Sequence, residues 1–168
     1  GGHDLSMAVN VSARLLSDLE LPRWIAQMLL AASVPPGRVT IEVTESTITA
    51  DPVRAMQVLH DLREIGVRLA VDDFGTGYSS LSYLRRLQPD ELKVDKSFVM
   101  QMGADENSAV IVRSTVELGH GLGLSVVAEG VEDQATYDAL ARLGADRIQG
   151  FHIARPMSGA ALKSWLDA

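Results

Sequence analysis

Two adjacent carboxylates, Asp72 and Asp73, stand at the end of the apolar run in RLAVDDFGTGYSSL, residues 68–81. Neighbouring like charges repel each other and raise each other's pKa, so such a pair is usually tolerated only where solvent, a base or a metal ion compensates the charge. The chain has no cysteine, so a metal would have to bind through oxygen or histidine. The pair therefore predicts a site for a hard divalent cation.

Every strand-like run of the chain carries a polar residue at or near its end. Besides the two aspartates, these residues are Asn10, Glu42, Lys93, Asp95, Glu129 and Gln149. Ligands of parallel α/β folds bind at the carboxyl edge of the sheet, where all the strand ends of a barrel meet. Carboxylate and amide oxygens that arrive there from different strands would form a site for Mg²⁺ or Mn²⁺.

Each of these residues also has an ordinary structural interpretation. The two aspartates could cap the helix that follows them, a role that Ser79 or Ser80 could take instead. Lys93 could be a surface residue of an edge strand, and Glu129 could be the partner of a nearby arginine. The recurrence of such a residue in six successive runs nevertheless favours one shared site.

The elements that would position these residues alternate along the chain. Short β-branched runs, such as residues 39–45 and 91–98, are followed by longer amphipathic stretches. In residues 51–66 the apolar positions recur every three residues, Asp51 is a candidate N-cap and Gly66 is a stop signal, so this stretch predicts a helix. Six such units without a linker predict a parallel α/β sheet, open or closed, in a single domain that spans residues 1–168.

The composition narrows the classes of function. The chain has 22 acidic and 15 basic residues, a formal net charge of −7, which argues against a broad surface for long DNA or RNA. No run approaches the roughly 20 apolar residues of a membrane span, and the N-terminus does not resemble a signal peptide. The absence of cysteine is typical of a reducing compartment. We therefore expect a cytoplasmic protein with no membrane segment in this chain.

Six ordered blocks of the sequence together resemble one known family. They are NVS (10–12), EVTES (42–46), DDFGTGYSSL (72–81), LKVDKSF (92–98), VAEGVE (127–132) and QGF (149–151). In this order and spacing they are similar to the EAL family of cyclic di-GMP phosphodiesterases, from about residue 5 to the C-terminus. The resemblance implies a modified TIM-type (β/α) barrel that uses two divalent cations, Mg²⁺ or Mn²⁺, to hydrolyse cyclic di-GMP to linear pGpG.

The resemblance also implies roles for individual residues of these blocks. The metal ligands would be Asn10, Glu42, Asp72, Asp73 and Glu129. The catalytic set would be Lys93, Asp95, Glu129 and Glu45. Within these sets, Asp72 would bridge the two ions, Lys93 and Asp95 would orient or deprotonate the attacking water, and Glu45 would hold the loop after Asp73. The substrate side of the site would be lined by Gln149 and Asp95.

One part of the family pattern is absent from the sequence. The chain contains no Glu-Ala-Leu segment, whose glutamate is a metal ligand in the family, and its first block corresponds to the third strand of the barrel. We therefore expect an incomplete barrel of about six β/α units without the first two strands, with little or no activity of this chain alone. An open barrel exposes strand edges and apolar surface, which predicts a homo-oligomer.

Other functions stay open at this stage. EAL relatives that lose catalytic residues serve as cyclic di-GMP receptors or protein-interaction modules, so a non-catalytic module is the alternative. The acidic residues that the chain keeps favour the enzyme, because a receptor has less need of a complete metal cage. An unrelated metal-dependent TIM-barrel lyase would need a substrate lysine or a phosphate loop that the sequence does not show. The resemblance also predicts fusion to sensory or cyclase domains in the longer protein.

Overall fold

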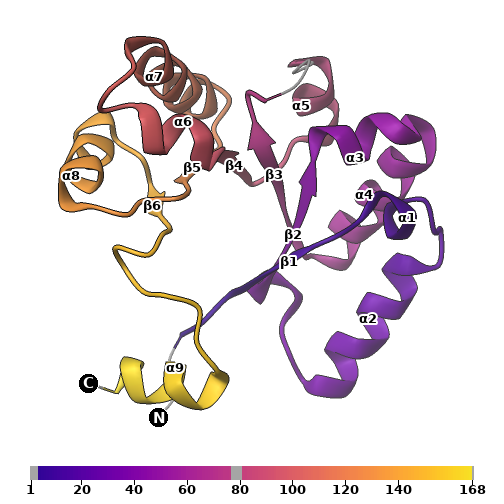
Figure 1. The fold of residues 1–168 in the computed structure, drawn as a ribbon. Coiled ribbons are helices and arrows are strands. Elements are labelled where there is room, and N and C mark those ends of the chain that lie inside the picture. Colours follow the sequence, from indigo (N-terminus) through magenta and orange to yellow (C-terminus); the bar gives the residue numbers. More distant parts are fainter. Residues whose placement is uncertain (1–3, 77–80, 168) are drawn as a thin grey trace.

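The computed structural model describes residues 4–76 and 81–167, which form one parallel sheet with helices around it (Figure 1). Each pair of successive strands is parallel and adjacent, so the sheet order within these residues is β1-β2-β3-β4-β5-β6. The sheet curls into an open half-barrel, and the predicted incomplete TIM-type barrel of six β/α units is confirmed. The strands are β1 Met7–Asn10, β2 Val39–Thr44, β3 Arg68–Phe74, β4 Glu91–Val94, β5 Ser125–Ala128 and β6 Arg147–Ile148.

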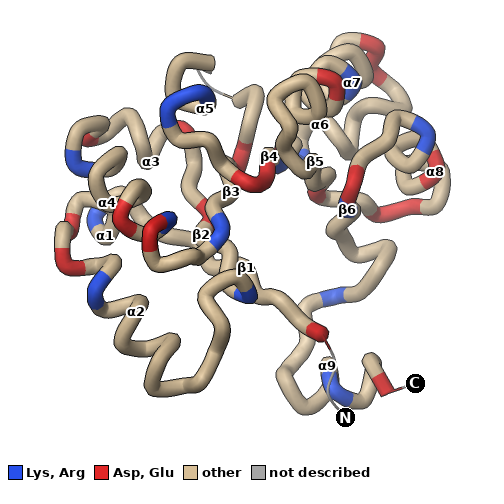
Figure 2. The backbone as a smooth tube through the Cα atoms, turned by 180° about the vertical axis from the view of Figure 1, so that it is seen from behind, with Lys and Arg blue, Asp and Glu red and all other residues tan. Residues whose placement is uncertain are grey.

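Helices fill the connections between the strands and cover the outer face of the half-barrel (Figure 1). None of the helices in the described residues is long and apolar enough to cross a membrane. They are α1 Ala13–Leu16, α2 Leu21–Ala32, the 3₁₀ helix η1 Pro36–Arg38, α3 Glu45–Ala50, α4 Pro52–Ile65, α5 Leu81–Leu87, α6 Lys96–Gln101, α7 Glu106–Gly121, α8 Gln134–Leu143 and α9 Gly159–Leu166. Helix α9 lies apart from the other helices (Figure 2), and its Trp165 lines the same cavity as residues 6–8 at the start of β1.

Helix α4 begins and ends where its sequence predicts. The side chain of Asp51 accepts a hydrogen bond from the amide of Arg54 at 3.3 Å, and Pro52 occupies the first helical position. Gly66 ends the helix with φ 92°, a left-handed conformation that glycine adopts without steric cost. The inner face of α4 is fully buried at Val58 and Leu62, which pack in the core beneath the sheet.

Two strands end earlier than the sequence predicts. Strand β2 stops at Thr44 instead of residue 45, and β4 stops at Val94 instead of residue 98. The physical reason is helix capping: the Thr44 hydroxyl accepts from the amide of Thr47, and the Asp95 carboxylate accepts from the amide of Ser97. Both helices that follow, α3 and α6, are short, and they start at the edge of the sheet where the predicted site residues lie.

Strand β3 carries one extra residue at its carboxyl end. Segment 71–74 of β3 pairs with segment 92–94 of β4, so Asp72 and Asp73 together lie opposite Lys93. Successive residues of a regular strand point to opposite faces of the sheet. Here the irregular register and the left-handed backbone of Asp73, φ 55°, place both carboxylates at the same edge. The alternative caps Ser79 and Ser80 lie outside the described residues.

Strand β1 forms one edge of the sheet and is exposed over its whole length. The side chains of Met7 and Val9 are 68% and 42% exposed. An apolar edge of this kind favours pairing with another strand, which is the physical basis of the predicted homo-oligomer. That association stays a prediction.

Candidate metal site at the carboxyl edge of the sheet

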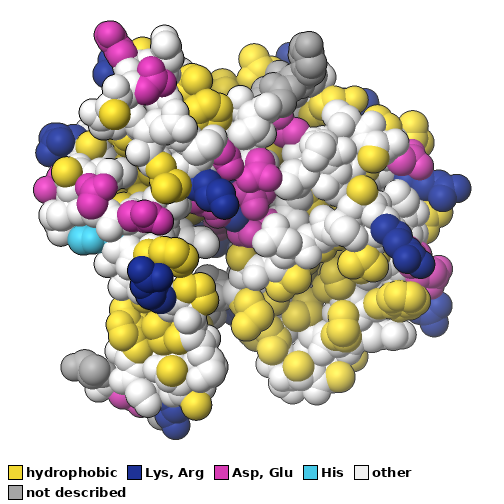
Figure 3. Space-filling view, viewed as in Figure 1, with side chains coloured by type: hydrophobic (Ala, Val, Ile, Leu, Met, Phe, Trp, Pro, Cys, Tyr) yellow, Lys and Arg dark blue, Asp and Glu magenta, His cyan; other side chains and the backbone are white. Residues whose placement is uncertain are grey.

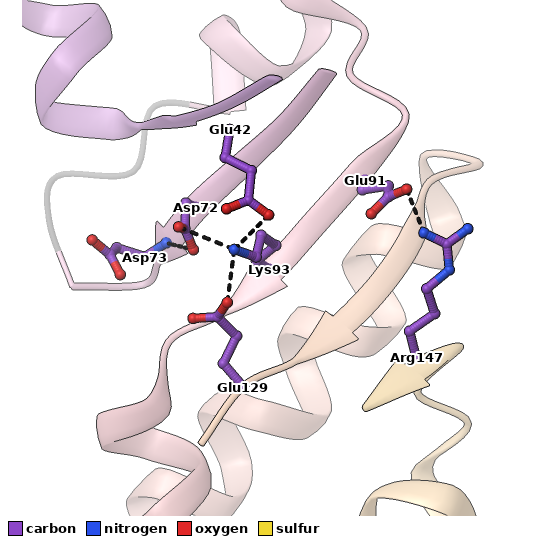
Figure 4. A network of polar contacts seen from close by, with 7 residues as sticks. All are labelled: Glu42, Asp72, Asp73, Glu91, Lys93, Glu129 and Arg147. Atoms are coloured by element: carbon purple, nitrogen blue, oxygen red, sulfur yellow. Dashed lines mark hydrogen bonds and ion pairs between the residues drawn. The ribbon is translucent and has the colours of Figure 1, made fainter. Parts of the chain in front are cut away.

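The ammonium of Lys93 lies between three carboxylates at the carboxyl edge of the sheet (Figure 4). Its Nζ is 2.8 Å from Glu42 Oε1, 3.1 Å from Asp72 Oδ2 and 2.7 Å from Glu129 Oε1. The four side chains come from β2, β3, β4 and the residue after β5, and none is more than 17% exposed. Three carboxylates around one ammonium leave two negative charges in excess. Figure 3 shows acidic side chains gathered in the central hollow of this face.

The buried cluster changes the pKa of its members. Burial alone would lower the pKa of Lys93, but hydrogen bonds to Glu129 and Glu42 outweigh burial, and the pKa of the ammonium is raised. The pKa of Glu129 is raised, chiefly by burial and further by the charges of Asp72 and Glu42, although the ammonium of Lys93 lowers it. Lys93 therefore stays charged at neutral pH, and the carboxylates around it remain short of positive charge.

Asp73 and Asp95 extend the cluster on the side of α6. The two side chains share a hydrogen bond, and the pKa of Asp73 is raised first by burial and then by the charge of Asp72. Burial would also raise the pKa of Asp95, but the hydroxyl and the amide of Ser97 both donate to its carboxylate and lower that pKa. The carboxylate of Asp95 is therefore fixed in direction and stays ionised.

The carboxylates fit a hard divalent cation. One oxygen each from Asp72, Asp73 and Glu129 lies within 4.8 Å of the others, and carboxylate oxygens are the ligands that Mg²⁺, Mn²⁺ and Ca²⁺ prefer. A cation at this point would also neutralise the excess negative charge of the cluster. The extra residue in β3 is what brings Asp73 into this group.

Asn10 and Gln149 lie at the same edge of the sheet as the cluster. Asn10 is exposed at the end of β1, in register with Glu42 of β2. Gln149 follows the two-residue strand β6, and its backbone N–H donates to the carbonyl of Ala128 at 2.9 Å. Gln149 lines a cavity of 410 Å³ on the concave side of the half-barrel, together with Glu42 and Lys93.

Glu45 lies at the start of α3 and belongs to a different environment. Its Oε2 is buried and has no hydrogen-bond partner among the residues that the structure describes. The side chain lines a small, mainly apolar cavity with Val71 of β3 and Leu84 of α5. Residues 77–80 of the loop that Glu45 is predicted to hold lie outside the described residues, so that role stays a prediction.

A second ionic cluster is centred on the buried Glu91 of β4, and no prediction from the sequence covers it. Glu91 is 5% exposed, and its Oε1 is 3.2 Å from Arg68 Nη2 and 2.6 Å from Arg147 Nη1 (Figure 4). Glu91 stands two residues before Lys93, so both side chains point to the concave face. A charged residue at the start of an apolar strand was the available signal, although its partners could not be read from it.

Comparison with known proteins assigns the chain to a family. The sequence model of the EAL domain family matches residues 1–156, nearly the whole sequence. The chain belongs to the EAL domain family. The resemblance seen in the six sequence blocks is thereby confirmed.

Relatives with known names cover almost all of the chain. The bifunctional diguanylate cyclase/cyclic di-GMP phosphodiesterase MucR of Pseudomonas aeruginosa is 44% identical over 163 residues, which are 96% of this chain and 24% of MucR. The signaling protein YkoW of Bacillus subtilis is 41% identical, over 93% of this chain and 20% of YkoW. The chain thus spans about a quarter or less of the length of these curated relatives.

Solved EAL structures share the fold closely. A structure of the MucR phosphodiesterase in complex with c-di-GMP has a TM-score of 0.90 and 43% identity, and the match covers 95% of this chain and 64% of that chain. A manganese and cyclic di-GMP complex of BlrP1 from Klebsiella pneumoniae has a TM-score of 0.81 and 39% identity, over 88% of this chain and 38% of that chain.

Proposed function

We propose that this chain is the catalytic part of a cyclic di-GMP phosphodiesterase that hydrolyses its substrate to linear pGpG. The observation that carries the proposal is the buried cluster in which Lys93 meets Glu42, Asp72 and Glu129. The c-di-GMP complex of MucR, at 43% identity, supports the choice of substrate. The 24% share of MucR that the chain spans leaves ample length for sensory or cyclase domains in the longer protein.

We propose Mg²⁺ or Mn²⁺ as the cofactor, with two ions in the complete site. The ligands from this chain would be Asn10, Glu42, Asp72, Asp73 and Glu129. The ions would lower the pKa of a bound water and stabilise charge on the phosphodiester oxygens. The excess negative charge of the cluster supports this choice, and so does the manganese complex of BlrP1.

The remaining site residues act on the water and the substrate. Lys93 keeps its proton because its pKa is raised, so it serves as a donor and an electrostatic support and not as the base. Asp95 stays ionised, and its carboxylate is aimed by Ser97, so it is the acceptor that orients the attacking water. Gln149 lines the cavity next to these groups, where its amide can contact the substrate. Glu45 supports the loop after Asp73.

The second candidate is a non-catalytic module that binds cyclic di-GMP or another protein. One specific observation keeps it open: the chain contains no Glu-Ala-Leu segment. The two functions differ in whether the bound nucleotide is hydrolysed.

The test is hydrolysis of cyclic di-GMP by the full-length protein with Mg²⁺ or Mn²⁺. We expect Glu42→Gln to lower kcat by roughly 10²-fold or more, because loss of one buried ligand or electrostatic group at such a site has an effect of that size. The matched control is Glu64→Gln, an exposed glutamate on α4, which should change kcat less than about twofold.

Two outcomes would overturn the proposal. If the Glu42→Gln protein were as active as the control, the Lys93 cluster would not take part in catalysis. Binding of cyclic di-GMP by the full-length protein without any turnover would instead establish the receptor. The isolated 168-residue chain serves as a further sample, and we expect little turnover from it.

A further inference from the structure

A polar cavity of 730 Å³ lies at the opposite ends of the strands from the Lys93 cluster. It is open to solvent and is lined by the last turns of α4 and α5, the starts of β3 and β5, the residues just before β4 and the turn between α7 and β5. Its polar lining includes Arg63, Arg68, Arg85, Gln88, Asp90 and Ser125. None of these residues belongs to the proposed phosphodiesterase site.

The carboxylates near this cavity already have partners. The side chain of Asp90 accepts a hydrogen bond from the amide of Leu69 at 2.8 Å. Glu91 is shared by the guanidinium groups of Arg68 and Arg147. Glu91 is therefore paired within the protein, whereas Asp90, whose donor is a neutral amide, keeps its negative charge in the lining of the cavity.

Two arginines of the cavity have no carboxylate partner. Arg63 donates through Nη1 to the carbonyls of Leu87 and Gln88, the first at 3.0 Å. The side chain of Arg85 makes neither a hydrogen bond nor an ion pair with any residue in 4–76 and 81–167. The charged lining residues are three arginines, Arg63, Arg68 and Arg85, and one carboxylate, Asp90, in a chain whose net charge is −7.

Helix ends explain only part of this positive charge. Basic residues stabilise the last turn of a helix, and Arg63 does so directly, because it donates to the carbonyl of Leu87 at the end of α5. The side chain of Arg85 donates to no carbonyl within the described residues, and Arg85 stands exposed on the last turn of α5. Its guanidinium is therefore available to a ligand in the cavity.

The wall of the cavity is held in an unusual conformation. Gln88 has φ 47°, in the left-handed region that residues other than glycine seldom adopt. The bond from Arg63 to the Gln88 carbonyl fixes this turn. Residues held in sparsely populated backbone regions cluster at ligand sites, because the surrounding structure must stabilise them.

We propose that this cavity binds a small phosphate-bearing molecule through Arg85 and Arg63. Guanidinium groups match phosphate oxygens in a bidentate geometry, and the volume falls within the roughly 300–1,000 Å³ of small-molecule sites. The negative charge of the rest of the chain disfavours a long polyanion, so the ligand is a small molecule and not a nucleic acid.

Calorimetric titration of the full-length protein with pyrophosphate tests the proposal. EDTA keeps the protein free of divalent cations, so that the acidic cluster at the other edge of the sheet repels the probe. We expect one saturable site for which Arg85→Gln weakens binding roughly tenfold, the effect of losing one charge-assisted hydrogen bond. Arg86→Gln is the matched control, because Arg86 is the next exposed residue of α5 and does not line the cavity.

Each outcome of the titration either supports or overturns the proposed site. A tenfold loss confined to Arg85→Gln, and a complete loss in Arg85→Glu, support the site. No saturable binding, or an equal loss in the Arg85→Gln and Arg86→Gln proteins, overturns it. Citrate that competes as well as pyrophosphate overturns the assignment to phosphate. Thermal unfolding of each variant shows whether it is folded. Both arginines are exposed, so we expect every variant to fold like the unchanged protein.

Discussion

The two ionic clusters of β4, each centred on a buried side chain, have opposite charge balances. At the carboxyl edge one ammonium, that of Lys93, faces three carboxylates. Toward the amino end one carboxylate, that of Glu91, faces two guanidinium groups. Lys93 and Glu91 are 3% and 5% exposed, and both point to the concave face of the same strand.

The difference shows which cluster needs a partner from outside the chain. Glu91 is fully compensated by protein groups, whereas the carboxylates around Lys93 keep two charges without a counterion. Buried charge that is not paired is costly. The acidic cluster therefore favours a bound cation, and the Glu91 cluster holds β3, β4 and β6 together without one.

The largest expected effect comes from removing the ammonium. Lys93→Ala leaves three buried carboxylates without their shared partner, which should lower the free energy of unfolding by about 3–5 kcal/mol in EDTA. Added Mn²⁺ should recover part of this loss, because the ion replaces the missing positive charge. Urea unfolding followed by circular dichroism measures both values.

The control for this substitution is Lys163→Ala, on the exposed face of α9, which should change stability by less than about 0.5 kcal/mol. Equal stability of the Lys93→Ala protein with and without Mn²⁺ would contradict the contrast between the two clusters.

A smaller effect distinguishes the two ends of β5. Gly130 and Gly123 flank this strand with φ 72° and 75°. A Cβ at Gly130 would lie 2.5 Å from Lys96 Cβ, whereas a Cβ at Gly123 would meet nothing within 4 Å. Gly123→Ala should therefore cost only the left-handed backbone strain, about 1–2 kcal/mol, and Gly130→Ala about 2–4 kcal/mol, because overpacking is added. Urea unfolding of the two variants checks this order, and the reverse order would show that the acidic edge tolerates displacement.

The smallest effect is a pH dependence of opposite sign at the two edges. The amide of Val126 donates to Asp146 at the amino end of β5 and lowers the pKa of that carboxyl. Its stabilisation is present above the ordinary pKa and is lost as the pH falls through the lowered value. Asp146→Asn should thus cost about 0.5–1 kcal/mol at pH 7 and nothing in strong acid.

The pKa of Glu129 is raised, chiefly by burial, so its ionisation on going to neutral pH destabilises the metal-free protein. Glu129→Gln should therefore be the more stable protein at pH 7 in EDTA, with the difference vanishing in acid. Thermal unfolding of both variants between acid and neutral pH measures how each substitution changes stability with pH. The same pH dependence for Asp146→Asn and Glu129→Gln would contradict the opposite signs expected at the two edges.

The sequence predicts the framework of the fold well because its signals are local. Alternating runs, the Asp51 cap and the Gly66 stop are each read from a few neighbouring residues, and the strand ends then bring Glu42, Lys93 and Glu129 to one edge. The extra residue in β3 could not be read in this way, because register depends on how β3 pairs with β4. Nor could the pairing of Glu91 with Arg147, which lies 56 residues further along the chain.

The extra residue in β3 makes the acidic edge sensitive to chain length and not only to side-chain identity. Deleting one residue between Val71 and Phe74 would restore regular alternation, so that one of the two neighbouring carboxylates would turn to the opposite face. Homologous sequences aligned with a gap at this point could retain every other acidic residue and still have lost the chemistry.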